Sequence, residues 1–126
     1  MKMALAILLG GGLGALGRYG VGLLALRSFG ATFPYGTLAV NIVGSIIMGI
    51  LIELMALRWD PAPELRGFLL VGLLGGFTTF SGFSMETVLL LERGQVLAAG
   101  LYILLSVAVT IAGFAAAVML TRQALI

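Results

Sequence analysis

The sequence contains neither cysteine nor histidine. These absences exclude disulfide bonds, thiolate nucleophiles and imidazole metal sites, and they remove the side chain that most often acts as a general base near neutral pH. Charged residues are also scarce, with 7 Lys and Arg and 5 Asp and Glu among 126 residues and a net charge of +2. We therefore predict that the chain is not an enzyme and has no catalytic residues. Because the cations are scattered singly and form no basic patch, we also expect no nucleic-acid partner.

Hydrophobic residues dominate instead, at 61% of the chain, and glycine adds a further 19 residues. The few charges leave long uncharged runs at residues 3–17, 28–52, 67–85 and 94–121. A helix needs about 20 mostly apolar residues to cross the hydrocarbon core of a bilayer. The sequence therefore predicts an all-α membrane protein, with one domain over residues 1–126. Its four transmembrane helices are expected at about residues 3–26, 36–57, 67–91 and 96–120.

The polar stretch at residues 58–66 contains two prolines and one interfacial tryptophan, and it predicts a loop at the membrane surface. An even number of spans places both termini on one side. The cations outside the spans are then distributed with only a weak bias toward the terminal side, which has Lys2, Arg58, Arg66 and Arg122, against Arg27 and Arg93 on the other side. So weak a bias permits insertion in both orientations and an antiparallel dimer of identical chains, although a single orientation with cytoplasmic termini also remains open.

Polar residues inside the predicted spans are the functional candidates, because each one costs free energy in hydrocarbon unless it faces a partner or a wet cavity. In the second span, Thr37, Asn41 and Ser45 are spaced by four residues and share one helix face. Such a stripe is often simple helix packing. Asn41 is harder to satisfy by packing, because its amide has two donors and two acceptor sites. We therefore expect Asn41 beside a permeating or bound polar species.

The third span combines glycines with hydroxyl residues in the middle of a membrane segment, which disfavours an uninterrupted helix. We expect a break near residues 75–81, whose freed carbonyl groups could bind a small cation; a kinked helix with threonine hydroxyls is the alternative. Phe80 and Phe83 follow on one face, either as ordinary packing or as ring edges that tolerate a small anion. Glu86 lies one turn further on, with Tyr102 or Ser106 of the fourth span as possible hydrogen-bond partners.

Three blocks resemble the signature blocks of the CrcB/Fluc fluoride channel family. They are residues 14–19 (Gly-Ala-Leu-Gly-Arg-Tyr), residues 36–45 (Gly-Thr-Leu-Ala-Val-Asn-Ile-Val-Gly-Ser) and residues 75–86 (Gly-Gly-Phe-Thr-Thr-Phe-Ser-Gly-Phe-Ser-Met-Glu). Length, number of spans and block order are also similar, so the resemblance covers essentially the whole chain. The third block is the most specific, because a glycine pair followed by Thr-Thr-Phe-Ser and a second Phe-Ser is not a general membrane pattern.

The resemblance implies a passive fluoride channel of the cell inner membrane, assembled from two antiparallel copies with two pores. It implies that Asn41 donates amide hydrogens to fluoride, and that Phe80 and Phe83 present ring edges to it. The remaining implied pore residues are Thr79, Ser81, Ser84, Glu86, Tyr102 and Ser106 along a polar track, and Arg18 near a pore mouth. A structural sodium ion would be held by the backbone carbonyls of Gly75 and Thr78. The chain departs from the family pattern at Gly82, where a threonine is usual, so one hydroxyl of the track is absent.

Three other functions stay open. A small multidrug exporter has the same number of spans and also forms dual-topology dimers, but that family uses a glutamate in its first span, where this chain has only Arg18. A proton-coupled fluoride carrier could use Glu86 as its relay. A purely structural membrane subunit would need none of the chemistry of Asn41 or of the third span.

Overall fold

The computed structural model describes all 126 residues, as helices joined by short turns, without a β-strand. The elements are α1 (Lys2–Phe29), α2 (Tyr35–Leu57), α3 (Pro63–Arg66), the π-helix η1 (Gly67–Leu74), α4 (Gly75–Phe77), α5 (Phe80–Glu92) and α6 (Val96–Leu125). Because α3 to α5 form one stretch, four segments are long and apolar enough to cross a membrane: Lys2–Phe29, Tyr35–Leu57, Pro63–Glu92 and Val96–Leu125. The prediction of an all-helical protein with four such helices is confirmed.

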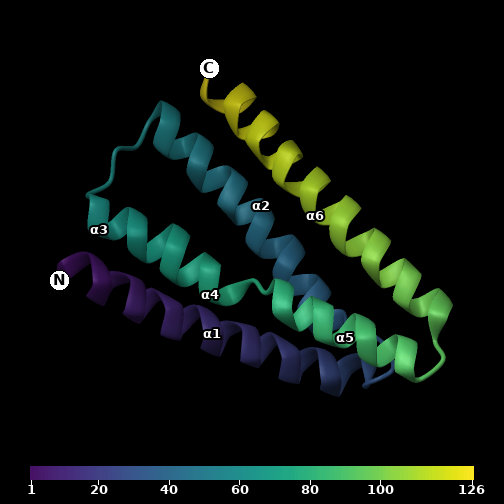
Figure 1. Ribbon diagram of the computed structural model, residues 1–126. Helices are drawn as coiled ribbons and strands as arrows, with labels where there is room; N and C mark the ends of the chain where they lie inside the picture. The colour runs from purple at the N-terminus through teal and green to yellow at the C-terminus, as the bar shows by residue number, and fades with distance from the viewer.

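The long segments alternate in direction, so that both chain termini lie at one end of the molecule (Figure 1). We call this the terminal end, and we call the opposite end, where α1 joins α2 and α5 joins α6, the loop end. The helices α2 and α6 run side by side and in the same direction. A Cβ atom on Gly49 of α2 would lie 2.8 Å from the carbonyl oxygen of Phe114 and 3.1 Å from Cβ of Ala117, both on α6. Glycine therefore permits the close approach of these two helices.

Glycines also set the contact between α1 and the third segment. A Cβ atom on Gly72 would lie 2.8 Å from the carbonyl oxygen of Ile7, and one on Gly76 would lie 2.6 Å from that of Gly11. A backbone can approach another this closely only where it carries no side chain at the contact. Part of the glycine content of the third segment therefore serves packing against α1.

The third segment leaves helical geometry at two residues. Thr78 (φ −86°, ψ 158°) and Thr79 (φ −155°, ψ 119°) are extended, between the end of α4 at Phe77 and the start of α5 at Phe80. Figure 1 shows this short extended linker between α4 and α5. The Thr79 hydroxyl caps α5 by accepting a hydrogen bond of 3.0 Å from the backbone N–H of Gly82.

One local prediction was wrong. The stretch at residues 58–66 was expected to be a loop throughout, but Pro63–Arg66 forms the first turn of the third segment. Proline at the first helical position leaves no N–H unsatisfied there, and Glu64 in the first turn suits the positive end of the helix dipole. Pro63, which was interpreted as part of a loop, is therefore the first residue of a helix.

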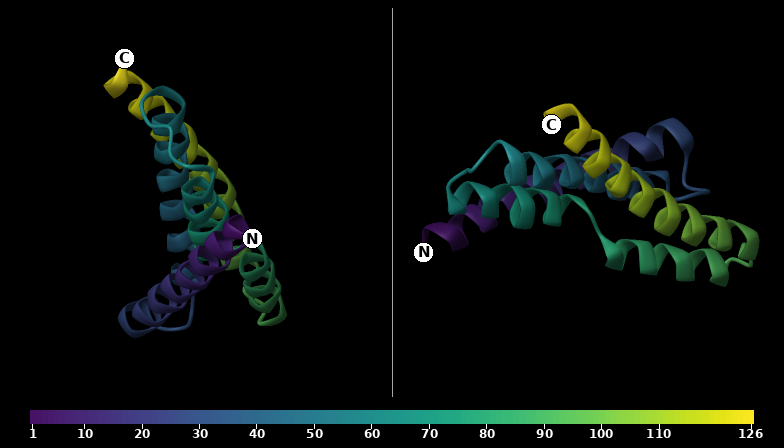
Figure 2. Two further views of the ribbon diagram at one scale, coloured as in Figure 1. Left: turned by 90° about the vertical axis from the view of Figure 1, so that its left-hand side faces the viewer. Right: turned by 90° about the horizontal axis from the view of Figure 1, so that it is seen from above.

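Few side chains are enclosed by the chain itself: only 17 of the 126 residues are buried. Large apolar side chains are exposed along every long helix. Such a surface is stable against lipid or another apolar protein surface but not in water. Toward the loop end α1 and α5 diverge, on opposite sides of α2 (Figure 2).

Candidate functional site

A cavity of about 320 Å³ lies beside the interruption of the third segment, and we call it the central cavity. Its lining comes from α2, the extended linker, α5 and α6: Asn41, Ser45, Thr78, Thr79, Phe80, Phe83, Ser106, Val107, Thr110 and Ile111. Half of the lining residues carry hydroxyl groups, and none is charged. The structure thus brings predicted site residues from three helices to one uncharged cavity.

Asn41 joins α2 to the extended linker. Its side-chain oxygen accepts a hydrogen bond of 2.8 Å from the backbone N–H of Thr79, and its amide nitrogen donates one of 3.0 Å to the Thr79 carbonyl. The extended backbone of Thr79 is therefore satisfied by a side chain, as buried polar backbone requires. An asparagine amide has two N–H groups, so one donor of Asn41 remains beside the cavity.

Phe80 and Phe83 lie against each other at the same cavity, with ring centroids 5.4 Å apart and ring planes at 49°. Their exposure differs sharply: Phe80 is 78% exposed and Phe83 is 9% exposed. The tilt lets each ring present its edge as well as its face, and the edge carries the positive part of the ring quadrupole. Phe83 is fixed by the fold, whereas Phe80 projects from the chain.

Two buried hydroxyl groups on α6 have no hydrogen-bond partner, Ser106 Oγ and Thr110 Oγ1. Both residues line the central cavity. Buried hydroxyls without a partner are rare, because each forfeits the hydrogen bonds it would make in water. They are therefore suited to a polar species in the cavity.

Glu86 was predicted to bond to Tyr102 or Ser106. It accepts hydrogen bonds from the Tyr102 hydroxyl at 2.9 Å and from the Thr37 hydroxyl at 2.7 Å, whereas Ser106 has no partner. These two bonds connect α5 to α6 and to α2. Tyr102 is fully buried, and its ring lies 5.2 Å from that of Phe83. The Glu86 network therefore adjoins the central cavity through the contact of these two rings.

Ser81 and Ser84 do not line the central cavity. Both are exposed. The Ser84 hydroxyl donates to the Phe80 carbonyl at 3.0 Å, and the Ser81 hydroxyl lies 3.2 Å from that of Thr79. Within one chain they are therefore not grouped with the other predicted pore residues.

Arg18 lies on α1 opposite the interruption, and its Nε donates a hydrogen bond of 3.1 Å to the carbonyl oxygen of Gly76. The carbonyls of Gly75 and Thr78 differ, because neither accepts any of the hydrogen bonds formed outside the helices. Beside the extended linker, the Gly76 carbonyl is thus held by an arginine, whereas those of Gly75 and Thr78 have no side-chain donor. Carbonyl oxygens of unwound membrane helices are suitable ligands for a small cation.

Gly82 allows the Thr79 hydroxyl to take its capping position. A Cβ atom on Gly82 would lie 2.8 Å from Thr79 Cγ2 and 3.2 Å from Thr79 Oγ1. A threonine at position 82 would therefore displace the Thr79 side chain from this position.

Sequence reasoning missed Thr110 and the hydrogen-bond partner of Thr37. Thr110 lies one helical turn beyond Ser106, which itself lies one turn beyond Tyr102, so the spacing of four residues could have identified it. Thr37 was recognised as part of the polar stripe on α2, but its bond to Glu86 joins residues 49 positions apart. No local pattern indicates so distant a pair.

The chain is similar to known proteins over nearly its whole length. A model of the family described as CrcB-like protein, Camphor Resistance (CrcB), matches residues 5–119. Curated relatives named fluoride-specific ion channel FluC include one from Rhodospirillum centenum, 49% identical over 124 residues, which are 98% of each chain. The relative from Rhizobium johnstonii is 46% identical over 97% of this chain and 98% of its own. The relative from Agrobacterium fabrum is 50% identical over 90% of this chain and 91% of its own.

Proposed function

This chain belongs to the CrcB family, and from that membership we propose that it is a fluoride-selective channel through which cytoplasmic fluoride leaves the cell passively. The family is one of ion channels, so the chain is not an enzyme. Together with the four long apolar helices, membership also makes it a multi-pass membrane protein. We further propose that its location is the cell inner membrane.

The observation that carries the proposal is the grouping of neutral hydrogen-bond donors around the central cavity. Fluoride is small and strongly hydrated, so it leaves water only where closely spaced donors replace its hydration shell. The second N–H of Asn41 and the unpartnered hydroxyls of Ser106 and Thr110 are such donors. A fixed cation in the wall would hold the anion too tightly for rapid exit, and the cavity lining contains none.

The aromatic pair adds selectivity by shape and charge. Ring edges carry the positive part of the quadrupole, so they attract a small anion that can approach them closely. Phe83, which is nearly buried, would form a fixed wall of the ion path. Phe80, at 78% exposure, would need a further surface to complete its side of the path.

We propose that a second, antiparallel copy of the chain supplies this surface, with one pore on each side of the dimer. The support is that a path beside Phe80 and the open central cavity is not enclosed by one chain. The weak charge bias between the two ends of the sequence permits both orientations. The exposed apolar faces that the partner leaves uncovered would contact lipid.

We also propose a structural sodium ion at the centre of the dimer, held by the carbonyls of Gly75 and Thr78. These oxygens fit a hard cation, because neither accepts a hydrogen bond formed outside the helices and they flank the interruption, Gly75 at the start of α4 and Thr78 in the extended linker. A bound sodium would add positive potential near the pores. Replacing sodium by N-methylglucamine should lower the thermal midpoint of the purified dimer, and equal midpoints in both solutions would contradict the site.

Fluoride efflux from liposomes, recorded with a fluoride electrode, tests the channel. We expect rapid efflux of fluoride but not chloride from vesicles that contain the wild type. Asn41→Ala and Phe80→Ile should both slow fluoride efflux. Phe80→Ile is less disruptive to folding, because the Phe80 side chain is exposed in the single chain. Val43→Ala, on an exposed face of α2, is the matched control and should conduct as the wild type does. Absence of fluoride efflux, or equal efflux of both halides, would contradict the proposal.

The same vesicles discriminate against a proton-coupled carrier that uses Glu86. A channel passes fluoride without a stoichiometric proton flux, so imposing a pH gradient alone should not drive fluoride uphill. Uphill movement, with slow turnover, would instead identify coupled transport.

A further inference from the structure

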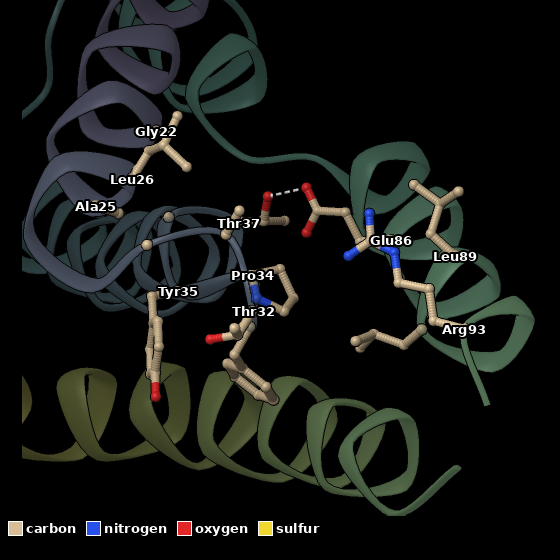
Figure 3. A pocket seen from close by; sticks show the side chains of 15 residues that line it. Gly22, Ala25, Leu26, Thr32, Pro34, Tyr35, Thr37, Glu86, Leu89 and Arg93 are labelled. Atoms are coloured by element: carbon tan, nitrogen blue, oxygen red, sulfur yellow. Dashed lines mark hydrogen bonds between the residues drawn. The ribbon is translucent and has the colours of Figure 1, made fainter. Parts of the chain in front are cut away.

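A second cavity, of about 240 Å³, opens at the loop end between the diverging ends of α1 and α5, and we call it the loop-end cavity (Figure 3). Its walls are the last turns of α1, the α1–α2 turn, the start of α2 and the last turns of α5. Two charged residues line it, Glu86 and Arg93. The central cavity, in contrast, is lined by no charged residue.

The two cavities are separated by a thin aromatic layer. Phe83 lines the central cavity, and Glu86, three residues later on α5, lines the loop-end cavity. Between them lies the buried ring of Tyr102, whose centroid is 5.2 Å from Phe83 and 5.5 Å from Phe33, which is a wall of the loop-end cavity. A path that continues from the central cavity along α5 therefore reaches the loop-end cavity after one layer of rings.

Glu86 creates an electrostatic problem on such a path. Its carboxylate accepts hydrogen bonds from two neutral hydroxyls, and it has no cationic partner, since the one ion pair of the chain joins Arg122 to Glu53. An anion approaching from the loop end would meet a negative charge without an ion-pair partner, and the low dielectric constant of the surrounding protein strengthens that repulsion.

Arg93 is placed to offset this charge without binding it. It caps the end of α5, and its side chain extends back into the cavity, toward the turn that carries Glu86 (Figure 3). It forms no ion pair with Glu86 or with the adjacent Glu92. Arg93 is exposed, and its side chain donates no hydrogen bond within the chain.

We propose that the loop-end cavity is a vestibule for small, hard anions, and that Arg93 admits the anion by cancelling the potential of Glu86. The inference rests on the proposed channel function and assigns it an opening at this end. Arg93 acts as a positioning charge: by offsetting Glu86 it raises the local anion concentration above the level that the carboxylate alone would permit, but it does not enclose the ion.

Arg93→Gln in reconstituted liposomes tests this, with Arg27→Gln as the matched control. Arg27 lies in the last turn of α1 at the same end and does not line the cavity. At low fluoride and low ionic strength, we expect Arg93→Gln to slow initial efflux about threefold and Arg27→Gln to leave it unchanged. The difference should shrink in high salt, because the Debye length falls from about 30 Å at 0.01 M to about 10 Å at 0.1 M.

Arg93→Lys keeps the charge and should restore the wild-type rate, which separates an electrostatic role from loss of folding. Equal rates for Arg93→Gln and Arg27→Gln at both ionic strengths would overturn the proposal, as would a faster rate for Arg93→Gln. A wild type that passes no fluoride would overturn the channel function itself, and the two failures are thus distinguishable.

Discussion

Glu53 and Glu86 lie toward opposite ends of the helices and are partnered in different ways. At the terminal end, Glu53 of α2 accepts two hydrogen bonds from Arg122 of α6, at 2.6 and 3.2 Å. At the loop end, both oxygens of Glu86 accept from neutral hydroxyls, those of Thr37 and Tyr102. Glu53 is only 5% exposed and lines neither of the two cavities. Glu53, which is paired with a cation, joins the ends of two helices. Glu86, which is held by neutral donors, places a carboxylate without an ion-pair partner beside a cavity.

The difference predicts that the two carboxylates fail differently when removed. Glu86→Leu should slow fluoride efflux about tenfold or more, because the part-buried Thr37 hydroxyl and the buried Tyr102 hydroxyl lose the acceptor that holds them beside the path. The repelling charge of Glu86 is lost as well, but Arg93 already offsets it, so the loss of the network should dominate. Efflux per reconstituted protein measures the loss, and gel filtration in detergent checks that the variant remains folded. Wild-type efflux from a well-folded Glu86→Leu would make the two carboxylates equivalent.

Removing the donors one at a time should have a smaller effect than removing the acceptor that they share. Tyr102→Phe keeps the ring contacts with Phe83 and Phe33 and loses only the hydroxyl. Thr37→Val likewise removes one donor. We expect each to slow efflux about threefold. In free energy this is about 0.6 kcal/mol, a fraction of what a hydrogen bond to a charged group contributes. Two threefold losses multiply to about ninefold, so the double variant should approach Glu86→Leu. A double variant that conducts much faster than Glu86→Leu would show that the carboxylate acts other than through these two hydroxyls.

These contacts also show where the sequence was sufficient. Uncharged runs were enough to predict four helices, because a bilayer imposes a minimum length on any apolar segment that crosses it. The composition of the third segment pointed to residues 75–81, and the extended residues are Thr78 and Thr79. Pro63–Arg66 was misassigned, because proline serves both turns and helix starts.

Long-range pairing was the part that the sequence did not supply. The spacing on α2 singled out Asn41, but not its two bonds to the backbone of Thr79. Glu53 was not recognised at all, since its partner lies 69 positions away at the end of α6. Helix periodicity assigns a residue to a face, and only the packing of helices decides what that face meets.

At the terminal end, Glu53→Gln should reduce stability rather than conduction. It would leave Arg122 without its counterion and weaken the contact that joins the ends of α2 and α6. We expect a lower thermal midpoint and a fluoride efflux, per folded protein, within about twofold of the wild type. Replacing both residues by methionine should recover much of the midpoint, because an apolar pair can take the place of an ion pair. A large loss of efflux in Glu53→Gln would show that the terminal end also belongs to the pore.

Arg58→Gln should have the smallest effect of these variants, and it therefore tests the contrast between the two ends of the molecule most narrowly. Arg58 follows α2 at the terminal end, and its Nη2 donates a hydrogen bond of 2.5 Å to the carbonyl of Leu125 at the end of α6. It therefore joins the same two helices as the Glu53 pair, but the bond is exposed to solvent, where water replaces it readily. A surface substitution of this kind changes stability by about 0.5 kcal/mol or less, so the thermal midpoint should fall by less than in Glu53→Gln, with unchanged efflux. If Arg58→Gln lowered the midpoint as far as Glu53→Gln does, the terminal end would be held by several charges acting together. The contrast with the neutral donors of the loop end would then lie in the number of charges rather than in one paired carboxylate.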